Sequence, residues 1–217
     1  MTVPYRKLYG EAQARHYAHA KESAARTHRG DVALVERALR LVPRDESLLD
    51  LPCGAGRMTA ALARLGFARL IAADVSPAMV ELARARLGSE GIAARLVLAD
   101  AEHLPFTDGE FDNVLCFRLF HHFPTEALRE QVARELCRVV RRRVIVSYLD
   151  ARSFTSRKRQ IERALKRGPP RPPSKFTQTP AEIAALFERA GFRLVADLAR
   201  LPLWHSLRLL VAQRRGR

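Results

Sequence analysis

Cysteine is scarce in this sequence, and its few copies lie far apart. The three cysteines, Cys53, Cys116 and Cys137, are an odd number and form no C-x-x-C pair. A disulfide framework needs paired cysteines, and a structural zinc site needs closely spaced thiolate or imidazole ligands, so neither is predicted. We therefore expect the cysteines to be buried and to pack as small apolar side chains.

Long apolar runs are also missing. No stretch approaches the roughly 18 consecutive apolar residues that predict a membrane-spanning helix. The first 20 residues contain no apolar core of the kind found in secretory signals. Together these absences predict a cytoplasmic protein.

Acidic residues are few relative to basic ones. The chain has 217 residues, of which 23 are Asp or Glu and 38 are Lys or Arg, and its formal net charge is +15. Such an excess suits nucleic acid, an anionic membrane surface or an acidic substrate, and it does not choose among them. Arginine dominates over lysine, and Ala and Leu are abundant, a pattern that a GC-rich coding bias also produces. Net charge alone therefore assigns no partner.

From residue 47 onward the sequence alternates between strand and helix patterns. Strands are predicted at 47–51, 69–75, 94–100, 111–117, 143–149, 192–201 and 206–214, and helices at 57–65, 76–87, 125–140 and 180–191. This alternation predicts parallel strands, right-handed crossovers and helices on both faces. The predicted fold class is α/β, a doubly wound and mostly parallel seven-stranded sheet whose last strand is antiparallel.

Two segments depart from this rhythm within a single predicted domain, 1–217. We divide the chain into an N-terminal helical lid at 1–30, a core at 31–150, a basic and Pro-rich insertion at 151–178, and a C-terminal helix with strands at 179–217. The insertion contains an amphipathic stretch with Ile161 and Leu165 on one side. Trp204, between the last two strands, is expected in the core.

The stretch LLDLPCGAGRMTAALA, residues 48–63, is the most informative local feature. A buried strand ends at Asp50 and Leu51, a flexible turn follows, and a helix begins near Gly56. Gly54 and Gly56 lack side chains, so the backbone can pass close to a ligand there. The N–H groups of the helix N-terminus point into the same space. In such sheets ligands bind beyond the carboxyl ends of the strands, so the turn predicts a small-molecule site.

Acidic residues also end the next two strands. Asp74 follows the second strand, where a carboxylate can accept hydrogen bonds from ribose hydroxyls. Asp100 follows the third strand and is placed to accept one from an adenine amino group. Either residue alone is compatible with a simple loop cap, but acids at three successive strand ends favour a nucleoside ligand. A nicotinamide enzyme is disfavoured, because Thr59 stands where its third glycine is needed.

Residues 48–146 resemble class I S-adenosylmethionine (SAM)-dependent methyltransferases, specifically the methyltransferase-11-like group that includes ubiquinone and menaquinone enzymes. The resemblance is carried by LLDLPCGAGRMT, IAADVSPAMVELARAR and LVLADAEHLPFTDGEFDNVLCFRLFHHF in this order. It implies a Rossmann-like fold and SAM as cofactor, with S-adenosylhomocysteine as product and no metal. It also implies cofactor contacts from Asp50, Pro52, Cys53, Gly54, Ala55, Gly56, Arg57, Asp74, Val75, Ser76, Met79, Asp100, Ala101, Glu102 and Phe117.

The sequence departs from the family pattern at two places. Pro52 replaces the first glycine of the turn, so that position has no N–H to donate to a ligand. The usual Gly-Gly after the fourth crossover helix is replaced by VVRRRVIV. Neither change touches the residues that the resemblance assigns to holding SAM by their side chains.

The methyl acceptor is less well defined. His121 or His122 is a candidate base, the alternative being that the His-His pair is structural. Candidate substrate contacts are Tyr5, Tyr9, Tyr17 and Arg157. A small-molecule or lipid-precursor acceptor is the main hypothesis. The alternatives are RNA or protein acceptors held by the basic insertion, for which no base-methylation motif is present, and a SAM-binding protein without catalysis. The insertion also suits peripheral contact with an anionic membrane. The sequence does not define an oligomeric state.

Overall fold

The computed structural model describes residues 22–40, 42–165, 175–201 and 203–216. The elements follow in the order α3 (Glu22–Ala38), β1 (Leu48–Asp50), α4 (Arg57–Arg64), β2 (Leu70–Asp74), α5 (Pro77–Ser89), β3 (Arg95–Leu98), β4 (Phe111–Cys116), η1 (Phe120–His122), α6 (Glu126–Val139), β5 (Val140–Leu149), α7 (Phe154–Leu165), α8 (Pro180–Arg189), β6 (Phe192–Ala199) and β7 (Leu207–Arg214).

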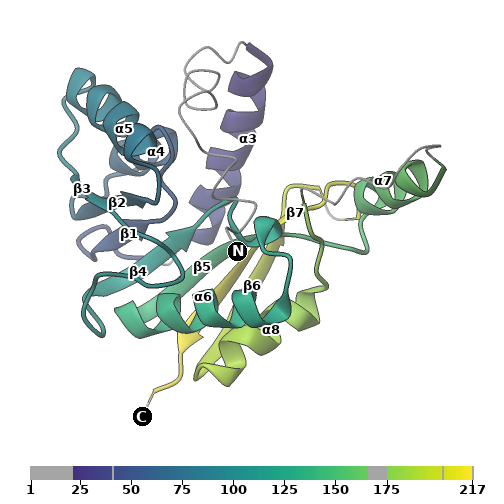
Figure 1. Ribbon diagram of the computed structural model, residues 1–217. Helices are drawn as coiled ribbons and strands as arrows, with labels where there is room; N and C mark the ends of the chain where they lie inside the picture. Colours follow the sequence, from purple (N-terminus) through teal and green to yellow (C-terminus); the bar gives the residue numbers. More distant parts are fainter. Residues whose placement is uncertain (1–21, 41, 166–174, 202, 217) are drawn as a thin grey trace.

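The strands form one seven-stranded sheet in the order β3-β2-β1-β4-β5-β7-β6 (Figure 1). The pairs among β1 to β5 are parallel, whereas β7 is antiparallel to both β5 and β6. This confirms the predicted fold class, including the antiparallel last strand. The strand order reverses between β1 and β4, so a ligand site is expected at their carboxyl ends.

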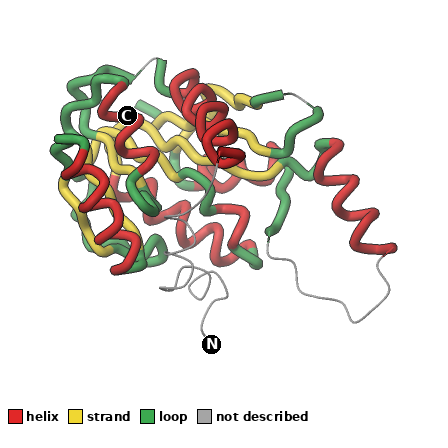
Figure 2. Tube along the Cα trace, turned by 90° about the horizontal axis from the view of Figure 1, so that it is seen from above, coloured by secondary structure: helices red, strands yellow, loops and turns green. Residues whose placement is uncertain are grey.

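Helices cover both faces of the sheet, as Figure 2 shows from above. One core cluster joins Val132 of α6 and Phe187 of α8 to one face. A second joins Leu34 of α3 and Leu62 of α4 to the other face. Alternate residues of a strand point to opposite faces, so the neighbours Leu48 and Leu49 belong to different clusters. Burial on both faces explains the continuous apolar strand sequences.

Local signals place the helix starts correctly. The Ser76 hydroxyl accepts the Met79 N–H and Pro77 is the first residue of α5. Thr125 caps α6 in the same way through the Leu128 N–H. All three cysteines are buried, as expected, and burial raises the pKa of each thiol.

Two expectations need adjustment. Trp204 is not in the core, because its side chain is 67% exposed in the loop between β6 and β7. The expected boundary between residues 30 and 31 lies within the continuous helix α3. The greater part of the predicted lid, residues 1–21, is outside the described residues. In the described part of the chain, no helix is long and apolar enough to span a membrane.

Candidate functional site

The glycine turn is fixed between three adjacent strands. It begins after Asp50, the last residue of β1, and ends where α4 begins at Arg57. The Leu51 N–H donates to the carbonyl of Leu115 on β4 (3.0 Å), and the Cys53 N–H donates to the carbonyl of Ala73 on β2 (2.8 Å). The Leu51–Pro52 peptide bond is cis. These contacts hold the turn over the carboxyl edge of the sheet.

The two glycines of the turn have different roles. Both have left-handed φ angles, 52° for Gly54 and 73° for Gly56. A Cβ at Gly54 would meet no atom within 4 Å, whereas a Cβ at Gly56 would lie 3.1 Å from the Cα of Ala83 on α5. Gly54 therefore faces open space where a ligand can approach. Gly56 allows the start of α4 to pack against α5, and the predicted backbone contact with a ligand at this position stays a prediction.

Asp74 connects the turn to the end of β2. One oxygen, Oδ2, accepts the Gly54 N–H at 2.9 Å, and the other, Oδ1, accepts the Ser76 N–H at 2.9 Å. Burial raises the pKa of this carboxyl, and the backbone hydrogen bonds act in the opposite direction. Each carboxylate oxygen retains further acceptor capacity for a ligand hydroxyl. Asp74 thus has a structural role in the turn beside the predicted ribose contact.

Asp50 lies under the turn and is completely buried. Its Oδ2 accepts the Thr59 hydroxyl at 2.6 Å. Its Oδ1 has no hydrogen-bond partner among the described residues. Burial raises the pKa of Asp50 to about 7, with a smaller contribution from Asp74, while the Thr59 hydrogen bond lowers it. A buried acceptor without a partner is costly, and a ligand N–H would satisfy it.

Two neighbouring cavities follow the strand ends and share Pro52 and Asp74. The first, which we call the strand-end cavity, has a volume of about 100 Å³ and is lined by His28, Asp31, Pro52, Cys53, Gly54, Ala55, Arg57, Met58, Asp74, Met79, Phe117 and Arg118. The second, called the small cavity, has about 20 Å³ and is lined by Leu51, Pro52, Asp74, Val75, Ala99, Asp100, Ala101 and Leu119.

Most of the predicted cofactor residues thus line one of these cavities. Those that do not are Asp50, Gly56, Ser76 and Glu102. The Glu102 N–H donates to Asp100 Oδ1 at 3.1 Å, which shapes the loop beside the small cavity. Of the predicted substrate contacts, Tyr5, Tyr9 and Tyr17 lie outside the described residues. Arg157 is exposed on α7 and lines neither cavity.

Sequence reasoning missed an ion pair that closes one side of the strand-end cavity. The Arg118 guanidinium donates from Nε and Nη2 to both oxygens of Asp31 at 2.8–3.1 Å. Asp31 is buried on α3, and Arg118 follows β4 with a left-handed φ of 62°. The position of Arg118 directly after a predicted strand, at the carboxyl edge of the sheet, could have marked it as a candidate site residue. No local pattern reveals Asp31, because its partner lies 87 residues away.

His28 of α3 also lines the strand-end cavity, although the sequence suggested only a general lid role for it. Burial lowers its pKa, and the charge of Arg57 lowers it further. The imidazole is therefore biased toward its neutral form near pH 7. His28 and Arg57 are candidate donors to an anionic part of a ligand.

The histidine pair lies in η1, just beyond β4. His121 is buried, and its ring centre is 4.3 Å from that of His122. The His121 carbonyl accepts the Phe176 N–H at 2.7 Å, which joins η1 to the end of the basic insertion. Burial holds the His121 pKa well below its usual range, so its imidazole is neutral at pH 7. A structural role for its backbone is therefore evident, and a proton-accepting role stays a prediction.

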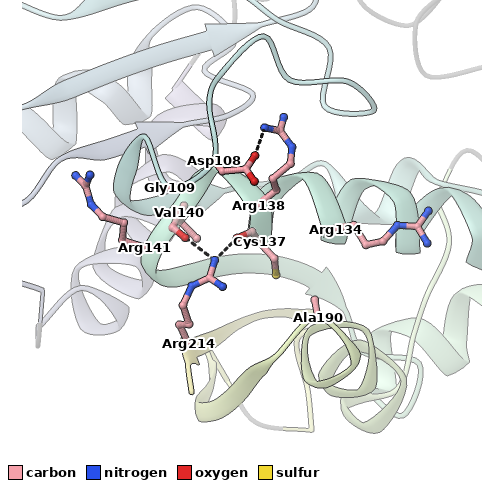
Figure 3. Close-up of a pocket in the computed structure, with 9 residues that line it drawn as sticks. All are labelled: Asp108, Gly109, Arg134, Cys137, Arg138, Val140, Arg141, Ala190 and Arg214. Atoms are coloured by element: carbon pink, nitrogen blue, oxygen red, sulfur yellow. Dashed lines mark hydrogen bonds and ion pairs between the residues drawn. The ribbon is translucent and has the colours of Figure 1, made fainter. Parts of the chain in front are cut away.

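A larger cavity, of about 570 Å³, lies at the amino ends of β4 and β5 (Figure 3). Two of the arginines that line it donate hydrogen bonds to backbone carbonyls and so have structural roles. Arg138 donates to the carbonyls of Leu104 and Phe106, and Arg214 donates to those of Cys137 and Val140 at the end of α6. It lies at the opposite edge of the sheet from the glycine turn, so it is not part of the candidate site.

Comparison with known proteins agrees with this geometry. A family described as "Methyltransferase domain" matches residues 48–143. Methyltransferase GfsG of Streptomyces halstedii is 41% identical over 102 residues, which are 46% of this chain and 36% of that protein. Demethylmenaquinone methyltransferase of Thermus thermophilus is 36% identical over 107 residues, 49% of this chain and 46% of that protein. The chain thus spans less than half of the length of these relatives.

Solved structures extend the likeness to nearly the whole chain. Magnesium protoporphyrin IX methyltransferase (ChlM) of Synechocystis PCC 6803, solved with bound SAH, has a TM-score of 0.72 at 22% identity. The likeness covers 97% of this chain and 93% of that one. In the described part of the chain, no group of three or more His, Cys, Asp or Glu side chains is arranged to hold a metal ion. Residues 48–143 thus match a methyltransferase-domain family, within a chain whose fold is that of solved SAM-dependent methyltransferases.

Proposed function

We propose that this chain binds SAM along the carboxyl ends of β1, β2, β3 and β4 and transfers its methyl group to a small-molecule or lipid-precursor acceptor. The observation that carries the proposal is the pair of neighbouring cavities that share Asp74, above a buried Asp50 whose Oδ1 has no partner among the described residues. A nucleoside with a charged side chain has matching parts: an ammonium group, two ribose hydroxyls and a flat base.

Each part of SAM has a candidate partner. Asp50 would accept a hydrogen bond from the methionine ammonium, and Gly54 would let the backbone approach that moiety. Asp74 would accept hydrogen bonds from the ribose hydroxyls. The adenine would lie against the residues that line the small cavity, which include Val75 and Ala101. A methyltransferase-domain match that begins at residue 48 and includes all of these residues supports the assignment.

SAM supplies a methyl group that is already activated on its sulfonium, so the chain chiefly has to orient the acceptor. Phe117 and Arg118 line the cavity at the β4 end and are the nearest candidates to meet an acceptor. Where the acceptor is a hydroxyl or an acidic carbon, a proton must leave it. The imidazole of His121, which burial keeps neutral, or the imidazole of His122 is the candidate for receiving this proton.

The preference for a small acceptor rests on relatives. The Thermus thermophilus relative is named for demethylmenaquinone, and ChlM is named for magnesium protoporphyrin IX. The acceptor itself stays open. An RNA or protein acceptor is the second candidate, favoured by the basic residues of α7. A SAM-binding protein without catalysis is the third.

The first test is the binding of SAM and S-adenosylhomocysteine, measured by calorimetry in the presence of a chelator. Both ligands should give saturable heat. Asp50→Asn should lose most of this binding, whereas Asp108→Asn, a matched change at a side chain that is 83% exposed outside the strand-end site, should not. Absence of heat and of any thermal shift with the wild-type protein would refute the proposal.

The second test identifies the acceptor. The protein is incubated with methyl-labelled SAM and cell extract separated into lipid, small-molecule, RNA and protein fractions. We expect label in the lipid or small-molecule fraction. Label that ribonuclease or protease releases would move the assignment to RNA or protein. Tight SAM binding with no labelled product in any fraction would favour the class without catalysis.

A further inference from the structure

Two segments place large apolar side chains in solvent at one end of the molecule. We call this surface the apolar tip. Its side chains are 57–76% exposed, and they are Phe154, Ile161 and Leu165 on α7 and Leu201, Leu203 and Trp204 in the loop between β6 and β7. Single exposed apolar residues are ordinary, but a group of this size indicates an interaction surface.

The two segments form one surface. The Phe154 N–H donates to the carbonyl of Leu203 at 2.7 Å, and the Thr155 N–H donates to that of Trp204 at 3.3 Å. The rings of Phe154 and Trp204 lie 5.4 Å apart. Leu203 has a φ of 68°, a left-handed conformation that is uncommon for a bulky residue, and its side chain points into solvent. The fold thus holds an unfavourable backbone conformation where it displays this leucine.

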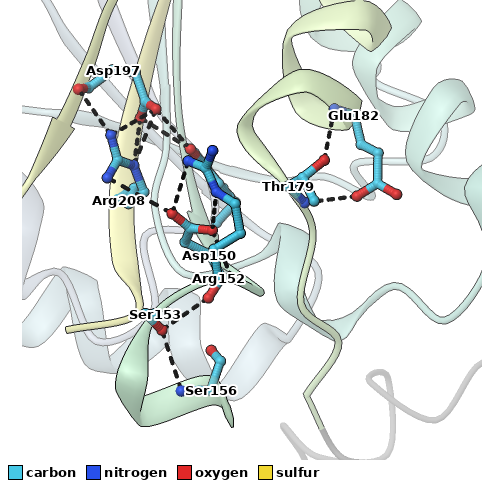
Figure 4. A network of polar contacts seen from close by, with 9 residues as sticks. Asp150, Arg152, Ser153, Ser156, Thr179, Glu182, Asp197 and Arg208 are labelled. Atoms are coloured by element: carbon cyan, nitrogen blue, oxygen red, sulfur yellow. Dashed lines mark hydrogen bonds and ion pairs between the residues drawn. The ribbon is translucent and has the colours of Figure 1, made fainter. Parts of the chain in front are cut away.

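The base of α7 is anchored, and its outer turns project from the body. The Ser153 hydroxyl donates to the carbonyl of Asp150 at 2.9 Å and accepts the Ser156 N–H at 3.2 Å (Figure 4). The Asp150 carboxylate accepts the backbone N–H and the Nε of Arg152. Figures 1 and 2 both show the rest of α7 extending away from the sheet and the other helices. The tip is therefore a protrusion and not a groove.

Basic side chains flank the α7 part of the apolar tip. Ile161 and Leu165 lie seven and eleven residues after Phe154, so all three share one face of the helix. Arg157 and Lys158 flank this face. Among the described residues, Arg152 just before α7 and Arg159 on α7 are also exposed.

Acidic charge on the described part of α7 is limited to Glu162, which lies 3.8 Å from Lys158. An apolar stripe bordered by long basic side chains is the pattern of a helix that lies in a membrane interface. The charge around the tip is complementary to anionic head groups.

We infer that the apolar tip docks on an anionic membrane surface, with its apolar side chains among the acyl chains and head groups and its bases on lipid phosphates. The ends of β1, β4 and β5 point the same way, and β5 leads directly into α7, so the tip and the strand-end cavity lie at the same end of the sheet. Resting on the proposed function, docking would bring a lipid-like acceptor from the bilayer to that cavity.

The chain contains a built-in reporter for this docking. Trp204 is the one tryptophan in the sequence, so fluorescence reports on the tip alone. The full-length protein is titrated with vesicles of an equal mixture of phosphatidylglycerol and phosphatidylcholine, and with phosphatidylcholine alone. The mixed vesicles should shift Trp204 emission to the blue and carry the protein into the pellet on sedimentation. Added salt should weaken this binding, because the phosphate contacts are screened.

Two variants separate the apolar and electrostatic parts of docking. Leu203→Asn suits the left-handed backbone and should lower the vesicle partition coefficient about tenfold. Arg157→Gln with Lys158→Gln should lower it about fivefold for each charge removed. Leu194→Ser changes an apolar side chain that is 41% exposed on β6, away from the tip, and is the matched control. Its partition coefficient should equal that of the wild type.

SAM affinity is measured on the same variants and should be unchanged, because none of these residues lines either cavity. Vesicle binding and SAM binding can therefore fail separately. Docking is refuted if mixed vesicles cause no blue shift, if phosphatidylcholine alone binds as tightly, or if the tip variants bind like the wild type. A blue shift that rises with protein concentration without lipid, together with dimers in sedimentation, would assign the tip to a second copy of the chain instead.

Discussion

Replacing Asp50 with asparagine should stabilise the protein without cofactor and weaken its binding of SAM. The Asp50 side chain is completely buried, and burial raises its pKa to about 7 from an ordinary value of 3.8. At 1.36 kcal/mol per pKa unit, holding this carboxyl as a charged group costs up to about 4 kcal/mol of folding free energy. Asparagine keeps an acceptor for the Thr59 hydroxyl and removes the charge.

The pH dependence follows from the direction of the shift. A carboxyl whose pKa is raised in the folded state contributes stability that is complete below its unfolded pKa and is lost as the pH rises to its folded pKa. For Asp50 that window extends from about 4 to about 7. The difference in unfolding free energy between Asp50→Asn and wild type should therefore grow by about 2–3 kcal/mol between pH 5 and pH 8. Urea denaturation of both proteins at the two pH values measures it.

SAM affinity should respond to pH in the opposite way to stability: it should rise with pH, whereas the stability of the wild-type protein falls. The ionised Asp50 is the candidate partner of the methionine ammonium, so wild-type SAM affinity should rise about fivefold from pH 6 to pH 8, less than the gain in ionised Asp50 because the ammonium itself begins to lose its proton near pH 8. The variant should bind SAM about 10- to 100-fold more weakly at pH 8 and lack this rise. A variant that binds SAM normally, or whose added stability is the same at both pH values, would refute the reasoning.

The other predictions concern the glycine turn and the thiols. Asp74→Ala should lower SAM affinity about 10- to 100-fold, which calorimetry measures. It should also destabilise the protein by about 1–3 kcal/mol in denaturation, because the Gly54 and Ser76 N–H groups lose their acceptor. Gly56→Ala should cost about 1–3 kcal/mol of unfolding free energy, since its Cβ would press on Ala83 and the backbone is left-handed there. Compared with Gly56→Ala, Gly54→Ala should lose less stability and more SAM affinity, because its Cβ would meet open space where the ligand binds. A thiol reagent should label the native protein slowly and the urea-unfolded protein fast, and rapid native labelling would contradict the burial of Cys53, Cys116 and Cys137.

The elements of the sheet and the cofactor-binding segments could be predicted from the sequence because their signals are local. A strand or helix shows its period over a few residues, and the caps at Ser76 and Thr125 act on N–H groups three residues away. Once parallel strands are predicted, their carboxyl ends share one edge of the sheet. Asp50, Asp74 and Asp100 could therefore be placed near one another without any knowledge of side-chain packing.

What only the tertiary structure decided depends on contacts between distant segments. The ion pair of Asp31 with Arg118 closes the cavity because α3 packs beside the end of β4, 87 residues along the chain. Gly56 is required by the approach of Ala83 on another helix. The hydrophobicity of a side chain predicts that its burial is favourable in free energy. It does not predict whether other parts of the fold pack over that side chain. Trp204 is a large apolar residue of the kind that cores contain, yet it lies in solvent beside Phe154, because the described part of the chain leaves its side chain largely uncovered.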